Sequence, residues 1–199
     1  MALKVPPFSK VAIIDGAGPT AGVYESTTDQ RFQLGTRYEL PDGRVFRYAK
    51  AGGTAQVQAF MTQTAVQESK AVAIVQGGHA QSVGSLDISV LVTTGSALAK
   101  NAFSGGWLVA NKVSPTVLGD IYSIEASELQ SVDTILDLRL ATPWRIAMTA
   151  SGEVSLNYSR YFETIVVPTT TITASPAGVP LSPVPINSFY CHRQKGLLH

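Results

Sequence analysis

The chain has 199 residues, of which 45% are hydrophobic, so it is long enough for one large domain or two small ones with a buried core. Only 15% of the residues are charged, against about a quarter in typical globular proteins. This favours a surface of which much is covered by partners; a polar surface rich in Ser, Thr and Gln is the alternative. The formal net charge of +1 argues against a globally basic nucleic-acid-binding protein and against charge-driven binding to anionic membranes.

The cysteine content and the apolar pattern indicate in which cellular compartment the protein is made. Cys191 is the single cysteine, so an intrachain disulfide is excluded. The first ten residues lack the apolar core of a secretion signal, and no apolar run approaches the roughly 20 residues needed to cross a bilayer. We therefore expect a soluble protein made in a reducing cytosol.

Residues 1–10 are expected to form an extended N-terminal arm, because Pro6 and Pro7 favour polyproline geometry. Residues 11–70 follow as an N-terminal region that contains a β-hairpin over residues 37–50. The turn of this hairpin is supplied by a Pro-Asp-Gly sequence. Aromatic and β-branched residues on both sides of the turn favour strands.

Apolar residues at helical spacing over 54–67 allow a short helix next, although the threonines and valines of that stretch weaken the prediction. Residues 71–167 are then expected to form a β-domain, because short segments alternate between apolar and polar side chains. The clearest is 135–140, in which three leucines alternate with an aspartate and an arginine. Several short strands with frequent turns indicate an all-β fold, either a β-sandwich or a barrel-like domain.

Residues 168–199 form a proline-rich C-terminal extension. Five prolines lie between residues 168 and 185, and proline cannot donate a hydrogen bond to a sheet, so an edge, arm or loop is expected. Arms at both ends suit a protein that reaches over its neighbours; a plain linker is the alternative.

The charged residues are unevenly distributed along the chain. The stretch from Arg31 to Lys50 is mainly basic, whereas the stretch from Asp120 to Asp137 is acidic. These stretches could pair between subunits and set their register. Two separately solvated faces are the alternative.

Sequence motifs for catalysis or for cofactor or metal binding are weak. The segment from Val11 to Gly18 resembles a dinucleotide-binding fingerprint, but no amphipathic helix follows it. The three histidines are far apart and have few neighbouring ligands, and neither a Gly-x-Ser-x-Gly elbow nor a converging acid pair is indicated. We therefore expect no enzymatic activity, no catalytic residue, no cofactor and no metal site.

Six segments between about Gly35 and Tyr190 carry a resemblance to a known family: RYELPDGRVFRYAKAGG, FSGGWLVANK, GDIYSIEAS, TILDLRLATPWRIAM, SGEVSLNY and VVPTTTITASPAGVPLSPVPINSFY. Together they resemble the capsid decoration, or cement, proteins of tailed bacteriophages. The resemblance implies a non-enzymatic β-rich virion protein on the capsid surface, made in the host cytoplasm. Such a protein would bind the outside of the head and bridge subunits of the major capsid protein, as a homotrimer and without nucleic acid or membrane.

Partner-binding residues are predicted in the N-terminal arm and in the hairpin: Pro6, Pro7, Arg37, Tyr38, Arg44, Phe46, Arg47 and Tyr48. Two alternative functions stay open. One is a structural protein of the phage tail or fibre. The other is a carbohydrate-binding adhesin module, in which Trp107, Trp144 and the tyrosines would line a sugar platform.

Overall fold

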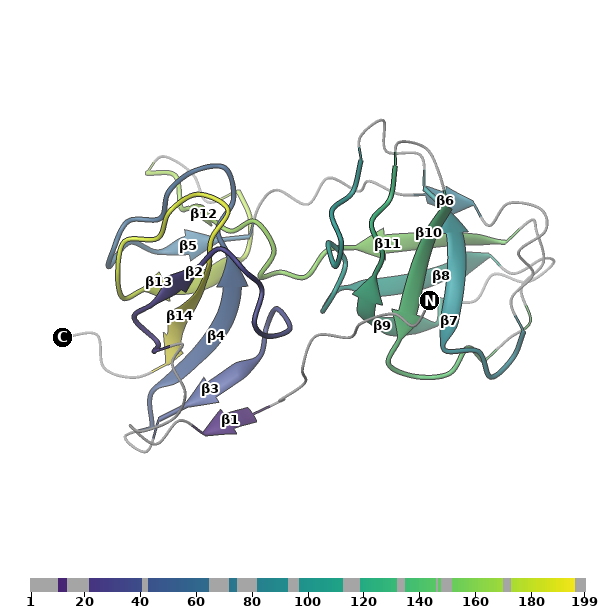
Figure 1. The fold of residues 1–199 in the computed structure, drawn as a ribbon, viewed down its shortest axis with the longest axis horizontal. Helices are drawn as coiled ribbons and strands as arrows, with labels where there is room; N and C mark the ends of the chain where they lie inside the picture. The colour runs from purple at the N-terminus through teal and green to yellow at the C-terminus, as the bar shows by residue number, and fades with distance from the viewer. Residues whose placement is uncertain are drawn as a thin grey trace. The chain divides into compact units, whose positions relative to one another are not determined.

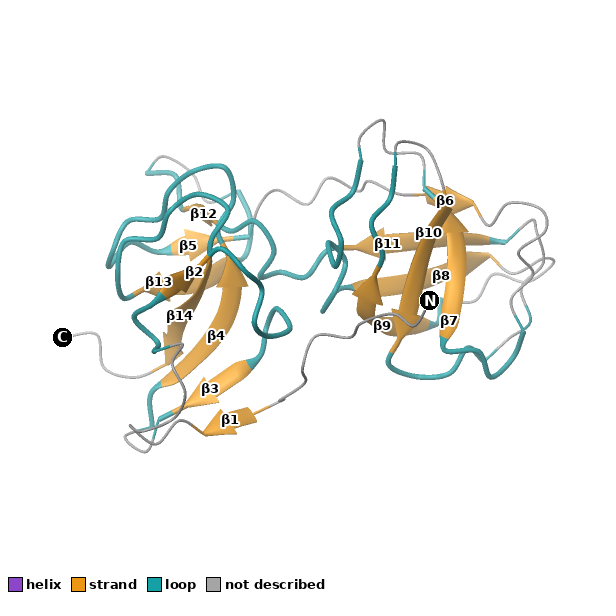
Figure 2. Ribbon diagram, viewed as in Figure 1, coloured by secondary structure: helices purple, strands orange, loops and turns teal. Residues whose placement is uncertain are grey.

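The structure is a computed structural model that describes residues 11–13, 22–40, 43–64, 72–74, 82–92, 97–112, 119–131, 135–145, 147, 152–169 and 173–195. Within these residues it contains strands and loops but no helix (Figure 2). The all-β fold predicted from the alternating patterns is therefore confirmed. Among the same residues, no helix is long and apolar enough to cross a membrane.

The strands fall into two compact units that do not simply follow each other along the chain (Figure 1). One unit, called the barrel unit here, comprises residues 68–159 together with residues 1–5. The other, called the sheet unit, combines residues 6–67 with residues 160–199. Residues 68–159 are thus an insertion in the sequence of the sheet unit, and their end at Ser159 falls inside the β-domain expected over residues 71–167.

The barrel unit is a closed barrel whose neighbouring strands are all antiparallel, in the order β10-β7-β6-β11-β8-β9. Its strands are β6 (Val72–Ile74), β7 (Asp87–Leu91), β8 (Trp107–Lys112), β9 (Ile121–Ser127), β10 (Ile135–Leu140) and β11 (Glu153–Asn157).

In β7, β9, β10 and β11 alternate side chains are buried in the barrel core. In β10, Leu136, Leu138 and Leu140 are buried whereas Asp137 is exposed, which confirms the prediction for this segment. Trp144, shortly after β10, is buried and stacks on a β9 tyrosine with ring centroids 4.5 Å apart. Burial of each such large apolar side chain contributes about 1.5–3 kcal/mol to stability.

The sheet unit contains one twisted sheet in the order β1-β3-β4-β14-β13-β5-β12, with β2 also paired to β14. All of its strand pairs are antiparallel except β1 with β3. Its strands are β1 (Val11–Ile13), β2 (Ser26–Thr27), β3 (Arg37–Glu39), β4 (Val45–Lys50), β5 (Thr62–Gln63), β12 (Ile165–Val166), β13 (Pro176–Pro180) and β14 (Phe189–Lys195).

The predicted hairpin is present as β3 and β4, with Tyr38 opposite Phe46. Gly43 adopts a φ of 81°, the left-handed conformation that glycine tolerates best. Pro41 and Asp42 lie outside the described residues. Beside the hairpin, β14 pairs along the length of β4, so the middle of the sheet joins segments from the two ends of the chain (Figure 1).

The helix allowed over residues 54–67 is wrong for the described part, residues 54–64. This part contains a bridge at Gln56, a turn and the short strand β5. Ala59 has a φ of 64°, which interrupts any right-handed helix. The β-branched residues of the stretch therefore prevail over its helical spacing.

The expectation of an arm or loop for residues 168–199 also needs correction, because two strands of the sheet unit come from this segment. β13 begins at Pro176 and ends at Pro180, while Pro183 and Pro185 lie in the following loop. The prolines thus sit where few ladder hydrogen bonds are lost. Residues 196–199 and the proposed N-terminal arm lie outside the described residues.

Candidate interaction surfaces

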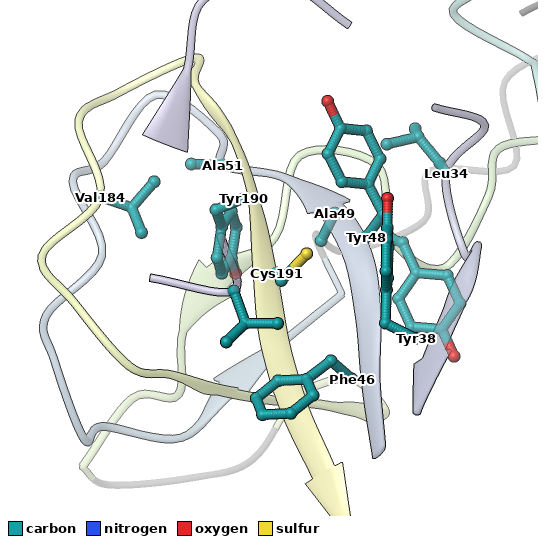
Figure 3. Packing of buried hydrophobic residues seen from close by; sticks show 11 residues of the cluster. Leu34, Tyr38, Phe46, Tyr48, Ala49, Ala51, Val184, Tyr190 and Cys191 are labelled. Atoms are coloured by element: carbon teal, nitrogen blue, oxygen red, sulfur yellow. The ribbon is translucent and has the colours of Figure 1, made fainter. Parts of the chain in front are cut away.

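The three aromatic residues predicted to bind a partner lie in the core of the sheet unit instead. Tyr38, Phe46 and Tyr48 are each at most 2% exposed (Figure 3). Phe32 contacts both tyrosines edge-on, with ring centroids 5.4 Å apart, and burial raises the pKa of both tyrosine hydroxyls. Their prediction as docking residues is corrected, because side chains that fill the core cannot also contact a partner.

The arginines of the hairpin behave differently from its aromatic residues. Arg37 forms an ion pair with Glu39 at 2.7 Å, and Arg47 Nη1 donates to the carbonyl of Gly35 at 2.7 Å. Arg44 Nη1 lies 3.5 Å from the Tyr24 hydroxyl. Pro6 and Pro7 lie outside the described residues. Of the predicted set, the arginines are therefore the side chains that the structure places at least partly at the surface.

Three arginines gather at one end of the sheet unit, in what we call the basic cluster: Arg37, Arg47 and Arg160. Arg37 lies opposite Arg47 in the β3–β4 ladder, and Arg47 lies opposite His192 in the β4–β14 ladder. Arg160 lies over the ring of Tyr161, 5.3 Å from its centroid, and that ring is 5.4 Å from the His192 ring. Sequence reasoning missed Arg160 because it is far from the hairpin along the chain.

His192 is a buried group beside this cluster. Its side chain is fully buried, and neither ring nitrogen has a hydrogen-bond partner in the structure. Burial, together with the charges of Arg160 and Arg47, lowers the pKa of His192 to about 3. Next to it, burial raises the pKa of the Cys191 thiol to about 12, which keeps that thiol protonated and unreactive at neutral pH. We therefore interpret both His192 and Cys191 as residues that pack in the core of the sheet unit.

Three carboxylates lie on neighbouring strands of the barrel unit, in what we call the acidic cluster: Asp87, Glu125 and Asp137. Arg139 Nη1 lies 3.0 Å from Asp87 Oδ1, and Arg139 Nε lies 3.7 Å from Glu125 Oε2. Asp137 Oδ1 accepts a hydrogen bond from the Ser89 hydroxyl at 2.6 Å. These residues come from the neighbouring strands β7, β9 and β10. Three carboxylates and one arginine give the cluster a local charge of −2.

Apolar side chains on the outside of β8 and β9 form a strand surface: Trp107, Val109 and Ile121. The side chain of Trp107 is 51% exposed and that of Ile121 is 63% exposed. Val109 lies directly opposite Ile121 in the ladder. Trp144 is buried, so the two tryptophans do not form a shared sugar platform.

A loop surface of the sheet unit consists of Val57, Phe60 and Met61, whose side chains are about half exposed. The loop is held by backbone hydrogen bonds from Ala59 N to the Pro180 carbonyl at 3.0 Å and from Val167 N to the Met61 carbonyl at 2.9 Å. Sequence reasoning assigned these apolar residues to a helix. The preceding Gly-Gly pair was the signal for a turn.

Comparisons of the chain with protein-family models, with curated proteins and with solved structures find no match in any of the three. Among the described residues, no group of three or more His, Cys, Asp or Glu is arranged to hold a metal ion. The functional argument therefore rests on the surfaces and clusters described above.

Proposed function

We propose that the protein is a virion structural protein that binds the outside of a tailed-phage head and stabilises the capsid by bridging subunits of the major capsid protein. A bridging protein needs at least two contact surfaces. Each unit of this chain carries an apolar surface of its own, the strand surface on the barrel unit and the loop surface on the sheet unit. This pairing is the observation that carries the proposal.

Both surfaces have the properties of binding hot spots. The backbone that carries Trp107 is fixed by a strand ladder, and the backbone that carries Phe60 belongs to a hydrogen-bonded loop. Preorganised aromatic side chains lose little freedom on binding, and such residues dominate the energetics of many interfaces. Burial of each large apolar side chain against a partner would contribute about 1.5–3 kcal/mol.

Capsid stabilisation then follows from mass action. A protein that binds the assembled shell but not its separated subunits shifts the equilibrium toward the shell. Because the shell is symmetric, the same modest contact is repeated over many copies. No bond-making chemistry is required of the protein.

The proposal is tested on heads of the encoding phage assembled without this protein. Wild type is added back beside two surface variants, Trp107→Ser with Ile121→Ser, and Val57→Ser with Phe60→Ser and Met61→Ser. We expect each variant to lower the affinity for heads at least about tenfold and to abolish the rise in the temperature at which heads disrupt. Occupancy is measured by quantitative gel analysis of purified heads.

The matched control for both variants is Val83→Ser, which removes an exposed apolar side chain outside both surfaces. It should occupy and stabilise heads like wild type. Wild-type occupancy by both surface variants would contradict the proposal, as would failure of the wild-type protein to bind heads.

The strand surface also favours a second candidate, a carbohydrate-binding module. Trp107 lies between Asn157 of β11 and Ser123 of β9 in the ladder, so an aromatic face is flanked by amide and hydroxyl groups, as in many sugar sites. Retention of the protein on a glycan array, lost in Trp107→Ser and combined with absence from purified virions, would favour this candidate over the capsid.

A further inference from the structure

The two units of the chain carry opposite charges that the overall net charge conceals. Residues 68–159 contain eight acidic and five basic residues, whereas residues 6–67 and 160–199 together contain six acidic and nine basic residues. With neutral histidines, the barrel range therefore has a formal charge of −3 and the sheet range one of +3.

Much of the charge difference lies in the two clusters, which carry opposite local charges. The acidic cluster contains three carboxylates, of which those of Asp87 and Glu125 pair with Arg139. In the basic cluster one of the three guanidinium groups, that of Arg37, pairs with the carboxylate of Glu39. The first has a local charge of −2 and the second one of +2. Both reach solvent, since the Asp87 side chain is 61% exposed and that of Arg37 is 36% exposed.

We propose that the acidic cluster of one copy of this chain binds the basic cluster of a second copy. Such a contact is heterologous, because it joins two different surfaces of identical chains, so it builds a closed ring or an open chain of copies. The inference rests on the charges of the chain and does not depend on the capsid proposal.

Electrostatics of this kind determines which surfaces meet and in which register more than it determines affinity. Exposed ion pairs individually contribute little, so the association is expected to be weak and sensitive to salt. The Debye length falls from about 10 Å at 0.1 M salt to about 3 Å at 1 M, so high salt should dissociate the copies.

The test measures the mass of the purified full-length protein by sedimentation equilibrium over a range of protein and salt concentrations. A contact between copies depends on protein concentration, whereas any attraction within one chain does not. Two charge-reversed variants are compared with wild type: Asp87→Lys with Asp137→Lys, and Arg37→Glu with Arg160→Glu. We expect each variant alone to weaken self-association at least about tenfold.

A mixture of the two variants provides the sharpest readout. In the first variant the cluster on the barrel unit is basic, and in the second the cluster on the sheet unit is acidic. These two clusters attract each other, so the mixture should associate although each variant alone associates only weakly. The control is Asp120→Lys with Glu153→Lys, which changes the charge of the barrel unit by the same amount outside the acidic cluster and should associate like wild type. Circular dichroism verifies that each variant is folded.

The proposal is overturned if wild type stays monomeric at low salt and high concentration, or if folded variants associate like wild type. It is also overturned if the mixture fails to associate. If the protein is monomeric but still binds phage heads, this inference is wrong and the capsid proposal stands. If the protein forms a salt-sensitive oligomer but does not bind phage heads, this inference is supported and the capsid proposal is wrong.

Discussion

Replacement of Gly106 by alanine is expected to destabilise the barrel unit by at least about 3 kcal/mol. A Cβ atom at this position would overlap the carbonyl oxygen of Asn157 and would lie only 2.9 Å from the carbonyl oxygen of Phe103. Both are backbone atoms, so no side chain can rotate away to make room. The substitution would therefore push the backbone just before β8 away from the end of β11.

Urea unfolding followed by tryptophan fluorescence measures this effect in the barrel unit alone, because both tryptophans of the chain, Trp107 and Trp144, belong to that unit. Val83→Ala, in the same unit, is the control, since Val83 is exposed, and its stability should stay within about 0.5 kcal/mol of wild type. An unchanged unfolding midpoint for Gly106→Ala would contradict the close approach of the two strands.

The stability of the sheet unit is expected to fall as the pH decreases below neutrality, because His192 stays uncharged in the folded state. Burial and the neighbouring Arg160 and Arg47 lower its pKa to about 3, whereas the unfolded chain titrates near the ordinary value of about 6.5. Between these values the unfolded state binds a proton that the folded state does not. Folding stability therefore decreases with falling pH, by up to about 1.4 kcal/mol per pH unit.

Replacement of His192 by leucine should remove this dependence. The variant also removes two buried nitrogens that lack partners, and an apolar side chain of similar size is tolerated well at such a site. We expect the stability of the variant relative to wild type to increase by about 2 kcal/mol between pH 7 and pH 5. Chemical unfolding monitored through NMR signals of the β14 amides measures the difference.

Gln63→Leu is the control for the pH effect, because it changes another buried polar side chain that does not titrate. Its stability relative to wild type should shift by the same amount at every pH. If His192→Leu showed the same parallel behaviour, the histidine would have to be charged or accessible in the folded state, and the expected pH dependence would be wrong.

What the sequence determined by itself is local. The alternation of leucines with Asp137 and Arg139 predicted both the strand β10 and the side that it buries, because a strand turns successive side chains to opposite faces. The Pro-Asp-Gly turn and its aromatic flanks likewise predicted the β3–β4 hairpin. The absence of any longer helical pattern matched an all-β chain.

Only the tertiary structure decided which strands meet and which faces are covered. The aromatic residues of the hairpin looked like a docking surface, but Phe32 and the C-terminal strand β14 pack on them. No pattern within the hairpin encodes its pairing with β14, which is distant in sequence. The acidic cluster, the basic cluster and the strand surface arise in the same way. Their members come from separate strands or loops that are brought together by long-range ladders, so their grouping is a property of the fold and not of spacing along the chain.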